Sequence, residues 1–263
     1  MKIRETLNSL KTTRISIVGS SASGKSSIIN ILLGETVVPY HHSIYCPCTI
    51  MYGAERKAML YFKDDILPNE RKNLPIVIKE NSQTEGTSHI PPLRITIDEL
   101  KENTASDFQG DCYLCPPYSK IEINIPSNFL KNKLEITEWP WLDNPFEHSR
   151  LCVKHLCADD IVIMTLNACA LISMDEMNFI EYVLNAQGIT PVFVITRADL
   201  MTDVEKVSII KYAKHHLSSY SPYDILLVST AQAIKGLKEN DETLFEKSNI
   251  ESLKVLLSSI IQQ

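Results

Sequence analysis

Short apolar runs alternate along this chain with longer segments in which apolar residues recur at helical spacing. The first run, at residues 14–18, is β-branched and leads directly into a glycine-bearing turn, which predicts a strand followed by a loop. Similar runs predict strands at residues 49–52, 58–62, 120–125, 134–137, 161–166, 191–196 and 224–229. Several of these runs are apolar at every position, which is typical of strands covered on both faces.

Helical patterns lie between the later strands. Two of them begin with capping boxes, Ser173 with Glu176 and Thr202 with Glu205, in which a hydroxyl and a carboxylate satisfy the first backbone N–H groups. A last apolar stripe predicts one helix over residues 242–262. Alternating strands and helices favour an α/β fold, with a mostly parallel sheet, right-handed crossovers and helices on both faces.

The pattern indicates one domain with a helix at each end. We expect an N-terminal helix at residues 1–12, a domain at 13–240 and a C-terminal helix at 241–263. Residues 63–119 are polar and contain prolines, which indicates an insertion into the domain with one short helix near residues 97–101.

Composition narrows the class of protein. The 263 residues are 44% hydrophobic, which is enough for a buried core, and the net charge of −6 provides no basic field for a nucleic acid partner. No stretch approaches the roughly 18 apolar residues of a membrane span, and the N-terminal segment has no apolar core of a signal peptide. The sequence predicts a cytoplasmic protein without a transmembrane segment, and peripheral membrane association stays open.

Seven cysteines are an odd number for a disulfide framework. Cys46, Cys48, Cys112 and Cys115 form two closely spaced pairs, and four thiolates are what a structural zinc ion takes. The two pairs are about 60 residues apart in the sequence, and reduced thiols in two loops are the simpler explanation. We prefer the interpretation as reduced thiols and keep zinc as the alternative.

The turn after residues 14–18 carries the chain's most specific motif. Its sequence, GSSASGKS, fits the phosphate-loop pattern GxxxxGK[ST] and lies between a strand and a helix, as that motif requires. Inward backbone N–H groups and the helix dipole would bind phosphates, Lys25 would reach the β and γ phosphates, and the Ser26 hydroxyl would bind Mg²⁺. The expected phosphate-binding residues are Gly19, Ser20, Ser21, Ala22, Ser23, Gly24, Lys25, Ser26 and Ser27.

The sequence around this motif resembles the dynamin-like large GTPases, especially their bacterial members. The resemblance rests on residues 24–35, on Val38-Pro39 and on Pro47-Cys48-Thr49, in the order that the family keeps. It implies a P-loop G domain over roughly residues 13–235, and it places Thr49 where the family has a switch threonine that closes over Mg²⁺ and the γ-phosphate. Without that resemblance, Thr49 is an ordinary strand residue.

A second motif concerns the base. Thr196-Arg197-Ala198-Asp199 follows an apolar strand, where G domains carry an [NT]KxD segment, and Ser229-Thr230 resembles the last base-contacting loop. The Asp199 carboxylate could accept two N–H bonds from guanine, whereas the corresponding edge of adenine offers none, so GTP and GDP with Mg²⁺ are the expected ligands. An aspartate that merely favours the start of the next helix is the alternative.

Two departures from the family concern hydrolysis. When the family's switch segment is aligned with residues 134–142, Glu138 takes the place of the Mg²⁺-linked aspartate and Trp141 that of a glycine. An alternative alignment with residues 143–146 puts Asp143 at the aspartate and Phe146 at the glycine. In the phosphate loop, Ala22 replaces a serine that helps to organise the attacking water. The flanking Ser21 and Ser23 offer hydroxyls that could substitute.

The sequence therefore supports nucleotide binding more strongly than hydrolysis. The resemblance implies a slow Mg²⁺-dependent GTPase stimulated by a homodimer of G domains, with Lys25, Ser21 and Thr49 in catalysis and with Ser26, Thr49 and Glu138 around the metal ion. Two other functions stay open: a regulatory or scaffold module that binds nucleotide without useful hydrolysis, and a P-loop small-molecule kinase.

Overall fold

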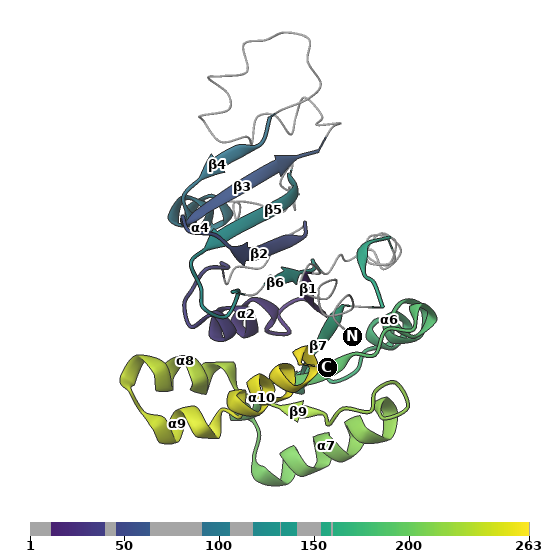
Figure 1. Ribbon diagram of the computed structural model, residues 1–263. Coiled ribbons are helices and arrows are strands. Elements are labelled where there is room, and N and C mark those ends of the chain that lie inside the picture. Colours follow the sequence, from purple (N-terminus) through teal and green to yellow (C-terminus); the bar gives the residue numbers. More distant parts are fainter. Residues whose placement is uncertain are drawn as a thin grey trace, which may run out of the picture.

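A nine-stranded sheet forms the centre of the protein, with the strand order β4-β3-β5-β2-β6-β1-β7-β8-β9 (Figure 1). The computed structural model describes residues 12–39, 46–63, 91–105, 118–131, 133–140, 154–158 and 160–262. The strands are β1 (Thr13–Gly19), β2 (Cys48–Tyr52), β3 (Lys57–Phe62), β4 (Leu93–Ile95), β5 (Tyr118–Ile125), β6 (Leu134–Glu138), β7 (Ile161–Asn167), β8 (Val192–Thr196) and β9 (Leu226–Leu227).

The sheet is mostly parallel, as predicted. β1 runs parallel to both of its neighbours, β6 and β7, and the parallel arrangement continues from β7 through β8 to β9. β2 pairs antiparallel with β6 and parallel with β5, while β3 pairs antiparallel with β5 and β4. Because β6, β1, β7, β8 and β9 point the same way, their carboxyl ends lie along one edge of the sheet, where ligands of open α/β sheets bind.

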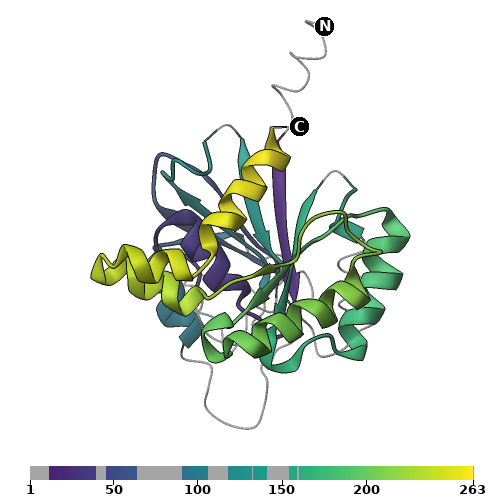
Figure 2. The ribbon, with the colours of Figure 1, turned by 90° about the horizontal axis from the view of Figure 1, so that it is seen from below.

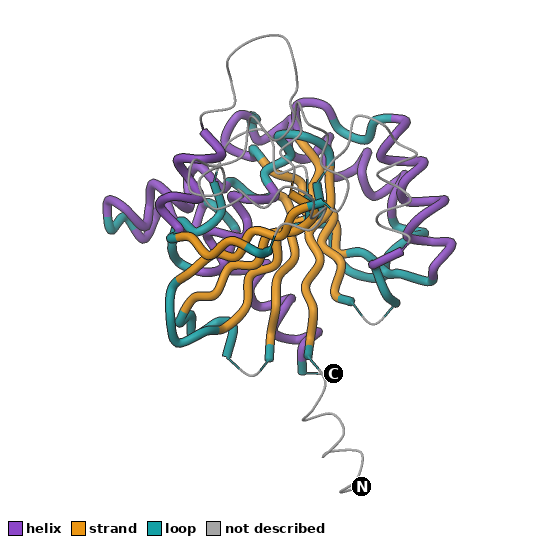
Figure 3. The backbone as a smooth tube through the Cα atoms, turned by 90° about the horizontal axis from the view of Figure 1, so that it is seen from above, coloured by secondary structure: helices purple, strands orange, loops and turns teal. Residues whose placement is uncertain are grey.

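Helices cover both faces of this sheet, as the view from above shows (Figure 3). One apolar core lies between the sheet and helices α2, α4, α8 and α10, and a second lies between the opposite face and the elements α6, η3 and α7 (Figure 2). The helical elements are α2 (Lys25–Leu33), α4 (Ile97–Ala105), η2 (Ala168–Ala170), α6 (Met174–Phe179), η3 (Ile180–Leu184), η4 (Asn185–Gln187), η5 (Ala198–Leu200), α7 (Asp203–Leu217), α8 (Thr230–Glu239), α9 (Glu242–Lys247) and α10 (Ile250–Ile261).

Local sequence patterns predicted the positions of most of these elements. Both predicted capping boxes are present, at the starts of α6 and α7. The strand predicted at residues 224–229 is shorter, Leu226–Leu227, because it is an edge strand with β8 as its neighbour and because Ser229 already caps α8. The sequence did not predict β4, a three-residue strand at the opposite edge of the sheet.

The prediction of one C-terminal helix over residues 242–262 is wrong. The chain forms α9 and α10, and Asn249 between them has a left-handed backbone with φ of 58°. Its side-chain amide donates a 3.0 Å hydrogen bond to the Leu227 carbonyl oxygen, and the Ser248 carbonyl accepts one from the Ser229 N–H. These bonds attach the break to the edge of the sheet, so tertiary contacts override the continuous apolar stripe.

The C-terminal helix packs on the domain itself. Leu253 and Leu257 of α10 are buried in the same core as Val228 and Ala233. The helix expected at residues 1–12 lies almost wholly outside the described residues, as does most of the insertion at 63–119. Across the described ranges, the helices are too short or too polar to cross a membrane.

Candidate nucleotide-binding site

The phosphate loop links the end of β1 to the start of α2, at the carboxyl edge of the sheet. Gly19 has a φ of 145° and Gly24 a φ of 94°, conformations that strongly favour glycine. A Cβ at Gly19 would lie 2.3 Å from the Thr165 Oγ1 atom, so the close approach of the loop to β7 also requires glycine. The sequence pattern and the backbone therefore agree on a loop that can wrap an anion.

Lys25 is held at this loop by the loop's own carbonyl groups. Its Nζ donates 2.9 Å hydrogen bonds to the carbonyl oxygens of Gly19 and Ser20. Burial lowers the pKa of Lys25, while the carboxylates of Glu138 and Glu176 raise it. The ammonium group is thus already placed beside the loop before a phosphate arrives.

Ser26 and Glu138 form the part of the site that suits a metal ion. The Ser26 hydroxyl donates a 2.9 Å hydrogen bond to Oε1 of Glu138, whose side chain is buried. Oε2 of Glu138 has no hydrogen-bond partner among the described residues, and burial raises the pKa of this carboxyl against the opposing effects of Lys25 and Ser26. A hydroxyl beside a carboxylate with an unpaired oxygen is a hard donor set that fits Mg²⁺.

This contact favours the register that assigns Glu138 to the switch aspartate position. Trp141 and residues 143–146, on which the rest of both registers depends, lie outside the described residues.

The structure does not bring Thr49 to the pair formed by Ser26 and Glu138. Its hydroxyl lies 3.1 Å from that of Thr137, its register partner in β6. Thr137 and Glu138 are consecutive strand residues, so their side chains point to opposite faces of the sheet. Thr49 therefore lies on the face opposite to Glu138, as expected for an ordinary strand residue.

Residues 196–199, called here the base-recognition segment after the role that the sequence predicts for them, are attached directly to the phosphate loop. The Thr196 hydroxyl donates a 2.8 Å hydrogen bond to the Ser23 carbonyl oxygen, and the Arg197 guanidinium donates one of 3.1 Å to that of Ala22. Thr196 is buried, so its hydroxyl helps to hold the loop backbone in place. Arg197 has a left-handed backbone with φ of 64°.

Asp199 is exposed beyond this attachment, and the end of β9 supports it. Its Oδ1 atom accepts a 2.5 Å hydrogen bond from the Ser229 hydroxyl, which also caps α8 by accepting the Gln232 N–H. Thr230 is the first residue of α8. The residues expected around the base thus gather at the ends of β8 and β9, next to the phosphate loop.

The two serines that flank Ala22 have different surroundings. Ser23 is fully buried, and its hydroxyl lies 2.6 Å from that of Thr165. Ser21 is exposed, and no hydrogen bond to its side chain occurs within the described ranges. Thr165 was not predicted as a site residue; the available signal was a single hydroxyl residue inside the apolar run 161–166.

The thiols of the zinc alternative are described only in part. Cys46 and Cys48 are buried free thiols, and burial raises the pKa of Cys46 to about 12 and that of Cys48 well above its usual value. Cys112 and Cys115 lie outside the described residues.

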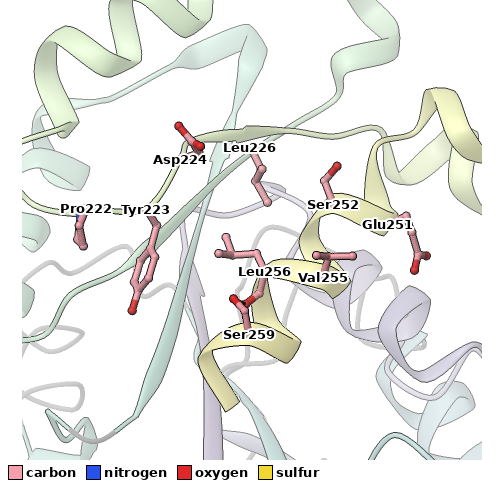
Figure 4. Close-up of a pocket in the computed structure, with 9 residues that line it drawn as sticks. All are labelled: Pro222, Tyr223, Asp224, Leu226, Glu251, Ser252, Val255, Leu256 and Ser259. Carbon is pink, nitrogen blue, oxygen red and sulfur yellow. Dashed lines mark hydrogen bonds between the residues drawn. The ribbon is translucent and has the colours of Figure 1, made fainter. Parts of the chain in front are cut away.

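A groove in the described part of the chain lies away from the residues of this site. It runs between the edge strand β9 and α10, and Figure 4 shows Tyr223 and Leu226 on one side of it and Leu256 on the other. None of its lining residues belongs to the phosphate loop or to the base-recognition segment.

A phosphate loop after β1, a carboxylate beside its serine and an aspartate after β8 together define a P-loop nucleotide-binding domain of the G-domain type. The sequence profile described as the dynamin family matches residues 15–198. The chain therefore belongs to the dynamin family, which confirms the resemblance seen in its motifs.

Individual relatives agree with this assignment. A bacterial dynamin-like protein of Nostoc punctiforme is 21% identical over 250 residues, covering 92% of this chain and 33% of that protein. Dynamin-like protein 1 of Campylobacter jejuni is 26% identical over 224 residues, covering 78% of this chain and 30% of that protein. The chain thus spans about a third of the length of these relatives.

A solved structure supports the fold. A chain from an oligomerised bacterial dynamin pair, described as sensing and tethering membranes at long range, superposes with a TM-score of 0.71. The match covers 97% of this chain and 39% of that chain at 24% sequence identity.

Proposed function

We propose that this chain binds guanine nucleotide with Mg²⁺ and hydrolyses GTP slowly, and that pairing of two G domains accelerates hydrolysis. The observation that carries this proposal is the attachment of the base-recognition segment to the phosphate loop through Thr196 and Arg197. Because the two parts are hydrogen-bonded to each other, one ligand with a base and a phosphate chain can span them.

Each end of the nucleotide has its own set of residues in this proposal. The loop's N–H groups and Lys25 bind the phosphates, Asp199 accepts the N–H groups of guanine, and the Arg197 side chain covers the base. Ser26 and Glu138 would hold Mg²⁺, which when bound supplies positive charge for the phosphate oxygens. The proposed contact of Thr49 with the metal requires the start of β2 to move, because its hydroxyl points to the other face of the sheet.

For hydrolysis, we assign the orientation of the attacking water to Ser21. Ser21 is the exposed serine next to Ala22, whereas the Ser23 hydroxyl is buried against Thr165. One exposed hydroxyl on a loop positions water less firmly than a packed group does, which is consistent with slow turnover.

Exposed apolar side chains support pairing of two copies at the nucleotide edge. Met174 and Val204, near the starts of α6 and α7, are 76% and 77% exposed, and Leu200 is 60% exposed. These elements follow β7 and β8, so the three residues lie towards the carboxyl edge of the sheet, where the phosphate loop also lies. Val204→Asp is expected to abolish acceleration at high protein concentration, whereas Val255→Asp, on the exposed face of α10, should not.

The contacts of Thr49 and Ser23 favour a second candidate, a regulatory module that binds nucleotide without useful hydrolysis. The Thr49 hydroxyl contacts Thr137 and the Ser23 hydroxyl contacts Thr165, so neither contacts Ser26 or Glu138. Phosphate release from GTP, followed over a range of protein concentrations, separates the two candidates. Release per protein molecule that rises with concentration supports the paired GTPase, while selective binding without release supports the regulatory module.

A further inference from the structure

Thr165 is a hydroxyl residue at the centre of a buried apolar strand. It is completely buried in β7, between Met164 and Leu166, which are buried as well. A hydroxyl group buried without a partner is unfavourable, so such a residue in a strand core is expected to make specific hydrogen bonds. Both bonds of Thr165 go to the phosphate loop or to the residue that precedes it.

The direction of these bonds follows from hydrogen counting. The Thr165 Oγ1 atom lies 3.1 Å from the Val18 carbonyl oxygen and 2.6 Å from the Ser23 hydroxyl. A carbonyl only accepts, and a hydroxyl has one hydrogen, so Thr165 donates to Val18 and accepts from Ser23. The Ser23 hydroxyl therefore donates its only hydrogen to Thr165 and is not a donor to phosphate or water.

The same side chain fills the space under the loop. An added Cβ at Gly19 would lie 2.3 Å from Thr165 Oγ1 and 2.8 Å from Ser23 Oγ. Val18 precedes the first loop glycine, and Ser23 precedes the second. Thr165 thus fixes both ends of the loop from one position on the neighbouring strand.

We propose that Thr165, acting through Ser23 and Val18, is a positioning residue that holds the phosphate loop in its phosphate-binding shape before nucleotide arrives. A preformed loop loses less conformational freedom on binding, so Thr165 raises affinity without touching the ligand. The effect belongs to the phosphate end of the site, because Asp199 is supported separately by Ser229. This inference rests on the proposed nucleotide binding.

The test compares Thr165→Val, which keeps the side-chain shape, with Thr165→Ser, which keeps the hydroxyl. Labelled GTP and ATP are titrated into each full-length, nucleotide-free variant with Mg²⁺. We expect about tenfold weaker GTP binding for Thr165→Val and a change below about twofold for Thr165→Ser. The ratio of GTP to ATP affinity should stay at its wild-type value, which general damage to the site would not preserve.

Two further variants keep the test decisive. Ser23→Ala should weaken GTP binding by about threefold, and the double variant should be no weaker than Thr165→Val, because both changes remove one shared bond. Ser221→Ala is the control: its buried hydroxyl accepts the Tyr223 N–H outside the loop, and its loss should leave affinity unchanged. Thermal denaturation shows that each variant is folded at the assay temperature, and Ser23→Ala alone decides the test if Thr165→Val does not fold.

If Thr165→Val binds GTP as tightly as the wild type, the positioning role is overturned and the proposed function is left intact. Ser23→Ala is judged in the same way if Thr165→Val does not fold. A wild-type protein that binds no nucleotide would overturn the proposed function and this inference together.

Discussion

The hydroxyl of Ser26, in the first turn of α2, donates a 2.9 Å hydrogen bond to Oε1 of Glu138 at the end of β6. The family resemblance places an aspartate where this chain has Glu138. The longer side chain reaches Ser26 directly and leaves its second oxygen buried without a partner in the described part of the chain. The pair is therefore an intact candidate for holding Mg²⁺ despite the changed residue.

Glu138→Gln should remove most of the Mg²⁺ dependence of GTP affinity. Glutamine keeps an acceptor for Ser26 but carries no charge for the metal ion. We expect Mg²⁺ to tighten GTP binding about tenfold less in the variant than in the wild type. The measurement is the GTP dissociation constant with and without Mg²⁺.

The proposed role of Glu138 in metal binding also predicts an effect of pH on the wild-type protein. Burial raises the pKa of Glu138 above its ordinary 4.5, so its carboxylate is protonated, and lost as a metal ligand, as pH falls through that raised value. The Mg²⁺ effect on wild-type affinity should therefore fade on acidification at a pH above 4.5. A Glu138→Gln protein with the same Mg²⁺ and pH dependence as the wild type would contradict this role.

Asp199→Asn should reduce the preference for GTP over ATP by about 10- to 100-fold. The asparagine oxygen can still accept the Ser229 hydroxyl, so the local structure is kept, while its amide nitrogen faces the N–H groups of guanine. Asp203→Asn, an exposed aspartate in the first turn of α7, is the matched control and should leave selectivity unchanged. Equal selectivity in Asp199→Asn and the wild type would mean that Asp199 only favours the next helix.

Ser21→Ala should slow phosphate release from GTP about 100-fold while leaving GTP affinity within about threefold. The reason is that Ser21 is assigned to the attacking water and not to the bound phosphates. Ser208→Ala, on the exposed side of α7, serves as the control. If phosphate release from GTP is unchanged in Ser21→Ala, Ser21 does not position the attacking water.

Leu253→Ala should lower the free energy of unfolding by about 3 kcal/mol, because it leaves a cavity between α10 and the sheet. Val255, two residues further on, is 63% exposed, and Val255→Ala should change stability by less than about 0.5 kcal/mol. Urea denaturation of the nucleotide-free protein measures both. Similar values for the two variants would show that α10 does not contribute to the domain core.

The sequence predicted those features that depend on local chemistry. The glycines and Lys25 of the phosphate loop are dictated by backbone conformation and charge, and the boxes at Ser173 and Thr202 are complete within one helical turn. Asn249 was not predicted to break the last helix, because the carbonyl of Leu227 that binds its side chain is distant in sequence.

The same reason explains why the sequence did not indicate the face on which Thr49 lies and why Thr165 was not predicted. Thr49 could be assigned to the metal from its motif, but the face to which it points is set by its pairing with Thr137. Thr165 carries no motif, and its importance depends on the proximity of Val18 and Ser23 in space.

Direct titration of the purified, nucleotide-free protein with labelled GTP, GDP and ATP in Mg²⁺ tests the central claim most directly. The account predicts that GTP and GDP bind at least about tenfold more tightly than ATP, and that Lys25→Ala weakens GTP binding strongly. Binding of ATP as tight as that of GTP, or no binding of any of the three nucleotides, would contradict it.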